Sequence, residues 1–276
     1  MMNDVKRRAS FIIHHSSVII LFALSVSAAQ HVPQRIVSLA PNVTEMLYFL
    51  GAGDRIAGTD DYSDFPPSAR AKPKVGGVNP NLERIVALHP DLAIASASSA
   101  HPALVRALAN VKIPLLIVRT DRARDIADSL VAVGTRLGMK DVAVRAQRLR
   151  DALERERRTR TKKKPRVLFL AYTQPVYVAG TDTFTGDIIE LTGAENAAAT
   201  KGWPQYSAEA LIANPPDVVI FPSKSVSRDA VVALFAKAPR APQIIAVDEN
   251  IFSRPGPRIV DAAHQLNEIL DKWEAH

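Results

Sequence analysis

Aromatic side chains gather in loop segments that contain proline, although aromatic residues make up only 6% of the chain. They are Tyr62 and Phe65 in DDYSDFPP, Tyr172 and Tyr177 around TQPV, Trp203 and Tyr206 in GWPQYS, and Phe252 in NIFSRPGPR, which also contains Arg254. Flat rings offer a large stacking area at little cost in conformational entropy, which suits a large planar ligand. Packing of the rings against the sheets beneath the loops is the alternative for each of them.

The sequence carries no recognisable group of catalytic residues. It contains neither a GxSxG nucleophile turn nor a GxxxxGK[ST] phosphate loop, and its histidines are scattered without metal-ligand spacing. Cysteine is absent, which excludes thiol nucleophiles, cysteine-bound zinc and disulfides. We therefore predict a binding protein with no catalytic residue and no metal site. An exported enzyme that uses Asp61 or Asp64 is the alternative from another class.

One segment of the chain occurs twice. NLERIVALHPDLAI at residues 81–94 recurs without a gap as SAEALIANPPDVVI at residues 207–220. Each copy predicts a short helix, a Pro-Asp turn and a buried strand, with Glu83 or Glu209 in the first helical turn. The distance between the copies is too long for a solenoid unit, so it indicates two similarly built lobes. The helix dipole favours a glutamate at this place by about 0.3–1 kcal/mol, which by itself explains either one.

Strands alternate with helices on both sides of a long basic segment. We predict strands at 35–40, 55–60, 91–96, 113–118, 166–172, 217–220 and 241–247. This alternation predicts an α/β protein with parallel sheets flanked by helices. The predicted organisation is an N-terminal lobe at 35–138, a single long bridging helix at 139–164 and a C-terminal lobe at 165–276. After the first strand, Asn42 and Glu45 predict a capping box that starts a helix.

The basic charge of the chain is local. Residues 139–164 contain eleven Lys or Arg and four Asp or Glu, an excess equal to the formal net charge of +7 of the whole chain. Apolar residues follow a helical spacing there, and a helix of roughly 24 residues would span about 36 Å. A helix with one buried stripe and a solvated basic surface explains the charge better than nucleic-acid binding, because no aromatic residue lies between the charges.

The N-terminus has the pattern of a secretory signal peptide. Three basic residues at 6–8 precede an apolar stretch at 11–26, and small residues follow at 27–29. A membrane anchor is the alternative, but it needs about 20 uninterrupted apolar residues. We predict a cleaved signal peptide at 1–29. Because the chain has no cysteine for lipid attachment, we expect a soluble protein in the periplasm.

Four segments together resemble a known family. They are RIVSLAPNVTEMLYFLGAGDRIAGTDDYSDFPP, PKVGGVNPNLERIVALHPDLAI, GWPQYSAEALIANPPDVVI and FSRPGPRIVDAAHQL, and they are spread over essentially the whole chain after the signal segment. These segments resemble the periplasmic substrate-binding proteins of cobalamin and iron-siderophore ABC importers, in particular the cobalamin-binding type. The resemblance implies two lobes bridged by one helix, with the ligand held in a cleft between them.

The resemblance also implies a role for individual residues at the ligand. Tyr62, Tyr177, Trp203 and Arg254 match positions that line the corrinoid site in that family, and we add Phe252 because it lies beside Arg254. One position departs from the pattern: a second tryptophan expected in the loop before NLE is missing, and Val78 stands in this loop. The wall of the first lobe is therefore less aromatic, which keeps haem or a ferric siderophore open as the ligand.

The two repeated glutamates gain a role from the same resemblance. Glu83 and Glu209 match glutamates that dock into arginine pockets of the membrane permease, one from each lobe. We therefore expect a monomeric periplasmic receptor that delivers cobalamin, its transported ligand, to an inner-membrane ABC permease and its ATPase. It would need no cofactor and bind no nucleic acid. The alternatives are a haem or ferric-siderophore receptor of the same fold, with Tyr62 or Tyr177 as the axial ligand of a haem, and a sensor domain.

Overall fold

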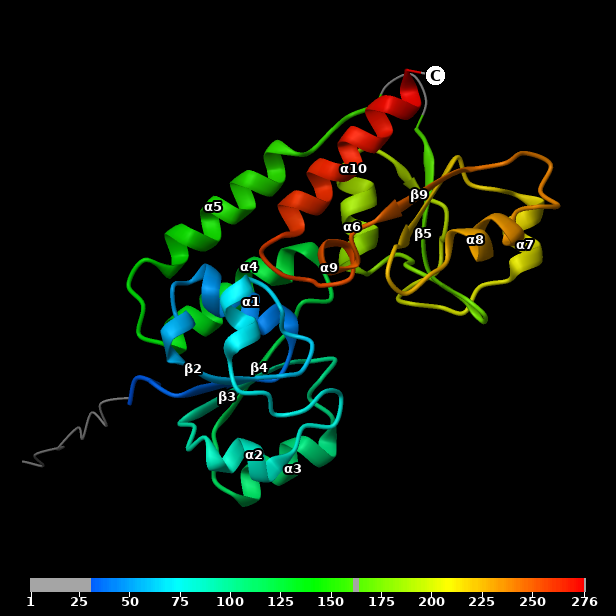
Figure 1. Cartoon of the computed structure of the whole chain (residues 1–276). Helices are drawn as coiled ribbons and strands as arrows, with labels where there is room; N and C mark the ends of the chain where they lie inside the picture. Colours follow the sequence, from blue (N-terminus) through cyan, green and yellow to red (C-terminus); the bar gives the residue numbers. More distant parts are fainter. Residues whose placement is uncertain (1–30, 161–163, 276) are drawn as a thin grey trace, which may run out of the picture. The chain divides into compact units, whose positions relative to one another are not determined.

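Figure 1 shows the computed structural model of the chain, which describes residues 31–160 and 164–275. The predicted signal peptide at 1–29 lies outside the described residues. Residues Val32–His276 form one compact unit. None of the helices in the described part is long and apolar enough to cross a membrane.

The first lobe is built on a four-stranded, all-parallel sheet. Its strands, in spatial order, are β2 (Ile56–Thr59), β1 (Ile36–Ser38), β3 (Leu92–Ser96) and β4 (Leu115–Val118). The helices of this lobe are α1 (Pro41–Phe49), α2 (Leu82–Ala87), α3 (Pro102–Asn110) and α4 (Ala123–Arg136), with short 3₁₀ turns η1 (Gly53–Arg55) and η2 (Pro67–Ala71). Parallel strands need crossover connections, and these helices supply most of them.

Side chains of the first sheet alternate between two buried layers, as the period of two in a strand requires. In β3, Leu92 and Ile94 pack into one hydrophobic cluster with residues of α1 and α4. Ala93 and Ala95 point to the other face, where they pack with residues of α2 and α3. Figure 1 shows α1 and α4 on one side of the strands and α2 and α3 on the other. The predicted parallel sheet with two covered faces is confirmed for this lobe.

The second lobe contains a five-stranded sheet that is parallel except at one edge. Its strands are β5 (Arg166–Thr173), β6 (Val176–Val178), β7 (Glu195–Asn196), β8 (Val218–Pro222) and β9 (Gln243–Val247), in the order β6-β5-β8-β9 with β7 beside β5. The β5–β6 pair is antiparallel. The helices are α6 (Phe184–Leu191), α7 (Ala208–Ala213), α8 (Arg228–Leu234), α9 (Glu249–Phe252) and α10 (Ile259–Glu274). Leu211 of α7 and Val231 of α8 pack under one face, while α6 and α10 cover the other.

The basic segment contains a shorter helix than its sequence predicts. Helix α5 (Val142–Arg155) has 14 residues, not the roughly 24 expected for 139–164. The helix ends at Arg155 because the residues after it form hydrogen bonds with the second lobe. The backbone N–H of Arg158, for example, donates to Leu191 O at 3.0 Å. Arg160 is buried, with its Nε donating to Thr192 O at 2.9 Å and its guanidinium paired with Asp271 and Glu274. These contacts fix the start of the second lobe.

The repeated segment forms the same structure in both lobes. Asn81 caps α2 by accepting from Arg84 N at 2.9 Å, and Ser207 caps α7 by accepting from Ala210 N at 3.1 Å. Each short helix is followed by a fully buried strand, β3 or β8. The predicted order of helix, turn and strand is therefore confirmed in both copies.

The predicted capping box at Asn42 and Glu45 is wrong. Helix α1 begins at Pro41, and its N-cap Ala40, two residues before the predicted cap, has no side chain that could accept a hydrogen bond. Proline suits this first position because its missing N–H would have no helical partner anyway. Asn42 and Glu45 are instead buried, and both make contacts with residues near the start of α10.

Candidate functional site

A cavity of about 370 Å³ lies where three parallel strands of the first sheet end. Its walls come from residues 39–42 after β1, from Asp60 and Tyr62 after β2, from Gly77 and Val78, from four residues of the 96–101 segment after β3, and from residues 253–255. Ligands of parallel α/β sheets bind beyond the carboxyl ends of the strands, at loops of this kind. The cavity is therefore the candidate binding site.

Tyr62 is the aromatic side chain in this lining. It is 57% exposed, which is unusual for a ring on a compact protein and leaves much of its surface for a ligand. The tyrosine backbone N–H donates to Asp60 Oδ2 at 3.0 Å, so the turn that presents the ring is held by a buried carboxylate. A side chain at Gly77 would begin 3.0 Å from the ring, so glycine lets the ring lie close to the neighbouring loop.

Asp60 is held almost entirely by the protein. It is 2% exposed, and the Ser63 hydroxyl donates to its Oδ1. Burial raises the pKa of Asp60 above its ordinary value of 3.8, against the opposing hydrogen bonds from Ser63 and Tyr62 and the charge of Lys74. The cavity lining therefore includes a buried acidic group whose two oxygens already accept hydrogen bonds from the protein.

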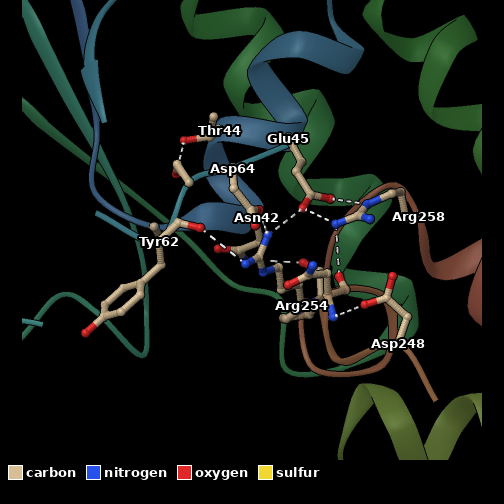
Figure 2. A network of polar contacts seen from close by, with 12 residues as sticks. Asn42, Thr44, Glu45, Tyr62, Asp64, Asp248, Arg254 and Arg258 are labelled. Carbon is tan, nitrogen blue, oxygen red and sulfur yellow. Dashed lines mark hydrogen bonds and ion pairs between the residues drawn. The ribbon is translucent and has the colours of Figure 1, made fainter. Parts of the chain in front are cut away.

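Arg254 also lines the cavity, but its guanidinium is occupied by the protein. It donates to Asp64 Oδ1 at 2.5 Å and to the carbonyl oxygen of Tyr62 at 3.2 Å, and it lies 3.6 Å from Glu45 Oε1. Figure 2 shows this network, with Arg254 between the loop of Tyr62 and the carboxylate of Glu45. The side chain predicted to meet a ligand thus fixes the loop that carries Tyr62.

Asp64 provides a pH-dependent test of this loop anchor. Burial would raise its pKa, but the hydrogen bond and charge of Arg254 outweigh burial and lower it below the ordinary value of 3.8. Its contribution to stability is therefore fully present above about pH 4 and lost as the pH falls through the lowered pKa. We expect Asp64→Asn to be less stable than wild type at pH 5–7, with a difference that shrinks toward pH 2. Urea unfolding at several pH values measures this, and a constant difference would contradict the ion pair.

Glu45 and Arg258 form the most buried ion pair of the network. The Arg258 guanidinium donates to both carboxylate oxygens of Glu45, at 2.9 and 2.5 Å, and to Asn250 O at 3.0 Å. It also lies 4.0 Å from the centre of the Phe65 ring. Burial raises the pKa of Glu45 above its ordinary 4.5 although Arg258 and Arg254 oppose the rise. The pair joins α1 of the first lobe to the N-terminal end of α10.

The aromatic residues predicted from the second lobe do not line this cavity. Tyr177 is half-buried in β6, with its ring edge-on to Tyr172 at 6.3 Å between ring centres. Trp203 is 44% exposed and packs edge-on against Phe169 at 6.0 Å. Phe252 is 0% exposed and belongs to the main hydrophobic cluster, so it packs in the core and does not contact a ligand as predicted.

The two repeated glutamates lie on the surface, in the first turns of α2 and α7. Glu209 Oε2 accepts from the Ser207 hydroxyl at 2.8 Å. A backbone hydrogen bond and this hydroxyl lower the pKa of Glu209 below its ordinary 4.5. Exposed carboxylates at equivalent places are thus available on both lobes.

Polar residues after β3 were missed by the sequence analysis. Ser96, Ser98, Ser99 and His101 line the cavity, and the Ser96 hydroxyl hydrogen-bonds to those of Ser98 and Ser99. The signal was present as the run SASSAH directly after a predicted strand, which is where ligand-binding loops of parallel sheets lie. In residues 31–160 and 164–275 no three His, Cys, Asp or Glu side chains are grouped as metal ligands.

The fold and the cavity define a two-lobed α/β binding protein with its candidate site on loops at strand ends. Residues 36–253 match the profile of the periplasmic binding protein family, and the chain belongs to that family. The resemblance seen in the sequence is thereby confirmed. Family members are substrate-binding proteins that work with the permease and ATPase of ABC importers, in the periplasm or outside the cell, and this protein is not an enzyme.

Relatives that bind two kinds of macrocycle resemble this chain. The vitamin B12-binding protein of Pectobacterium atrosepticum is 34% identical over 257 residues, which cover 88% of this chain and 90% of that protein. The periplasmic vitamin B12-binding protein of Vibrio cholerae is 26% identical with a TM-score of 0.73, covering 89% of this chain and 99% of that one. The periplasmic haem-binding protein of Roseiflexus sp. RS-1 is 27% identical, also with a TM-score of 0.73, covering 85% and 96%.

Proposed function

We propose that this protein captures a corrinoid, cobalamin in the first place, and delivers it to an ABC permease in the inner membrane. The observation that carries the proposal is the cavity at the ends of β1, β2 and β3. It combines one exposed aromatic ring, Tyr62, with a lining whose polar side chains are mostly uncharged, among them Asn42 and four serines. A large, flat ligand with uncharged hydrogen-bonding groups suits this combination, and cobalamin carries several carboxamides around its ring. The relative named for vitamin B12 supports the same choice.

The charges in the lining favour cobalamin over haem. Arg254 is the one Lys or Arg among the described lining residues, and it is already paired with Asp64 and Glu45. The buried carboxyl of Asp60 lies in the same lining. A ligand with two carboxylates, such as haem, would need cationic partners, since a carboxylate is stabilised by donors and opposed by like charge. A neutral ligand needs none.

Haem remains the second candidate on one observation. The exposed Tyr62 lines the cavity, and its phenol oxygen could serve as an axial ligand to ferric iron. The Roseiflexus relative shows that a protein of this fold binds haem. Titrating the purified protein separately with hydroxocobalamin, haemin and a ferric siderophore, followed by heat and visible absorbance, separates these ligands. Heat only with haemin or siderophore would overturn the corrinoid proposal.

We further propose that Tyr177 and Trp203 of the second lobe contact the same ligand from the other side. Trp203 leaves nearly half of its surface free, and its ring contacts the Phe169 ring in a near-perpendicular arrangement. Glu83 and Glu209 would then dock the loaded protein onto the permease. Export by a signal peptide at 1–29 and a monomeric state complete the proposal.

Val78 offers a gain-of-affinity test. It is 73% exposed and lines the cavity on the loop where the cobalamin-binding type carries a tryptophan. Val78→Trp adds an aromatic surface beside the ligand, and an aromatic contact contributes about 0.5–1.5 kcal/mol beyond its area. We expect cobalamin to bind roughly 2- to 10-fold more tightly by calorimetry. Val232→Trp, at an exposed valine of α8 outside the lining, is the matched control. Unchanged affinity in the Val78 variant would mean that the ligand does not use this wall.

A further inference from the structure

Asn42 is a buried side chain in the cavity lining whose amide orientation is fixed by its neighbours. It is 5% exposed, and its Nδ2 donates to Thr120 Oγ1 at 3.1 Å and to the backbone carbonyl of Pro255 at 3.3 Å. A backbone carbonyl can only accept, so the atom facing Pro255 must be the nitrogen of the amide. Both amide hydrogens therefore have partners.

The oxygen of the same amide is left over. Within residues 31–160 and 164–275, no hydrogen bond reaches Asn42 Oδ1, although Asn42 lines the cavity. A carboxamide oxygen has two acceptor positions, and buried polar atoms in proteins are nearly always paired. Asn42 Oδ1 thus offers an acceptor that is held in place and suits a ligand N–H group.

His101 also lies in the lining, but it offers a ligand no donor. Its Nδ1 accepts from the backbone N–H of Leu104 at 3.2 Å, where it caps helix α3. Its Nε2 is enclosed by the protein and has no hydrogen-bond partner in the described part of the chain, so a ligand in the cavity does not reach it.

We infer that Asn42 forms a subsite for a primary carboxamide of the ligand. The NH₂ group of the carboxamide would donate to Asn42 Oδ1. A carboxylate in the same place has no hydrogen for Asn42 and adds a charge near the carboxyl of Asp60. The inference rests on the proposed function, because it names which groups of a corrinoid the cavity recognises.

Ligand chemistry tests the subsite with the unaltered protein. Cobalamin can be compared by calorimetry with its monocarboxylic acids, in each of which one side-chain carboxamide is hydrolysed to a carboxylate of nearly the same shape. We expect one of these acids to bind at least about tenfold more weakly than cobalamin, a loss of about 1.4 kcal/mol, while the others differ by less than about threefold. Equal affinity for cobalamin and all the acids would overturn the inference and leave the proposed function standing.

One variant connects the discrimination to Asn42. Asn42→Ala removes the acceptor, so the poorly bound acid should come within about threefold of cobalamin. Discrimination that survives Asn42→Ala would assign it to another part of the cavity and overturn the subsite. Failure to bind cobalamin at all would overturn the proposed function, and the subsite with it.

Discussion

Charge reversal at both Glu83 and Glu209 is expected to abolish transport while leaving ligand binding unchanged. Each carboxylate is exposed in the first turn of its own six-residue helix, and each lies outside the lining of the cavity. If they dock into basic pockets of the permease, a lysine at either place replaces an attraction by a repulsion. Repulsion between like charges at an interface costs several kcal/mol, so two reversals should prevent productive docking.

Uptake of labelled cobalamin by cells that carry the permease and each receptor variant measures this effect. Calorimetry with purified Glu83→Lys/Glu209→Lys protein should give the wild-type affinity. Asp229→Lys is the matched control, because Asp229 is also an exposed carboxylate in the first turn of a short helix, α8. All three lysines lose the favourable interaction with the helix dipole, about 0.3–1 kcal/mol each. Normal transport by the double variant, or loss of transport in the control, would contradict the proposed docking role of Glu83 and Glu209.

Removal of Arg258 is expected to produce the largest loss of stability. Its guanidinium pairs with both oxygens of Glu45, whose side chain is 3% exposed. Arg258→Ala leaves a buried carboxylate with only Arg254 nearby, at 3.6 Å. Breaking a buried ion pair from one side typically costs about 3–5 kcal/mol, because the remaining charge stays buried. Urea unfolding at pH 7 should show a loss of this size.

The direction of the pH dependence distinguishes this mechanism from simple loss of packing. Burial already raises the pKa of Glu45 above 4.5, and removal of Arg258 raises it further, because one of the opposing partners is gone. The excess instability of Arg258→Ala is therefore fully present above the pKa of Glu45 in the variant. It is lost as the pH falls from there to the wild-type pKa of Glu45, which itself lies above 4.5. Replacing both residues, with Glu45→Met/Arg258→Met, removes both charges and should cost much less than Arg258→Ala. A pH-independent loss would indicate packing alone.

The sheets could be predicted from sequence because their strands are short apolar runs. β1, β3 and β8 are wholly buried. Short apolar runs such as IVS and LAIAS, separated by helices, are typical of the inner strands of a parallel sheet. The edge strands β6 and β7 were missed, since three and two residues show no periodicity. The length of α5 was overestimated because polar helix formers continue past Arg155, and contacts with the second lobe end the helix.

Only part of the cavity lining could be predicted from the sequence, namely residues whose local sequence alone indicates an exposed loop position. Tyr62 could be found because an aromatic ring between prolines has few places to be buried. Asn42 could not, because its partner Pro255 is 213 residues away in the chain, and the local pattern favoured a helix cap. Phe252 was misassigned because the single turn of α9, which buries its ring, has no periodic signal of its own.

The central claim is that the cavity lined by Tyr62, Asn42 and His101 selects a neutral corrinoid. Equilibrium dialysis of the purified protein against an equimolar mixture of cyanocobalamin, haemin and a ferric siderophore tests it most directly. We predict that cyanocobalamin accumulates in the protein compartment in a one-to-one ratio and that Tyr62→Ala reduces this accumulation. Retention of haemin or the siderophore, with cyanocobalamin left equal on both sides of the membrane, would contradict the claim.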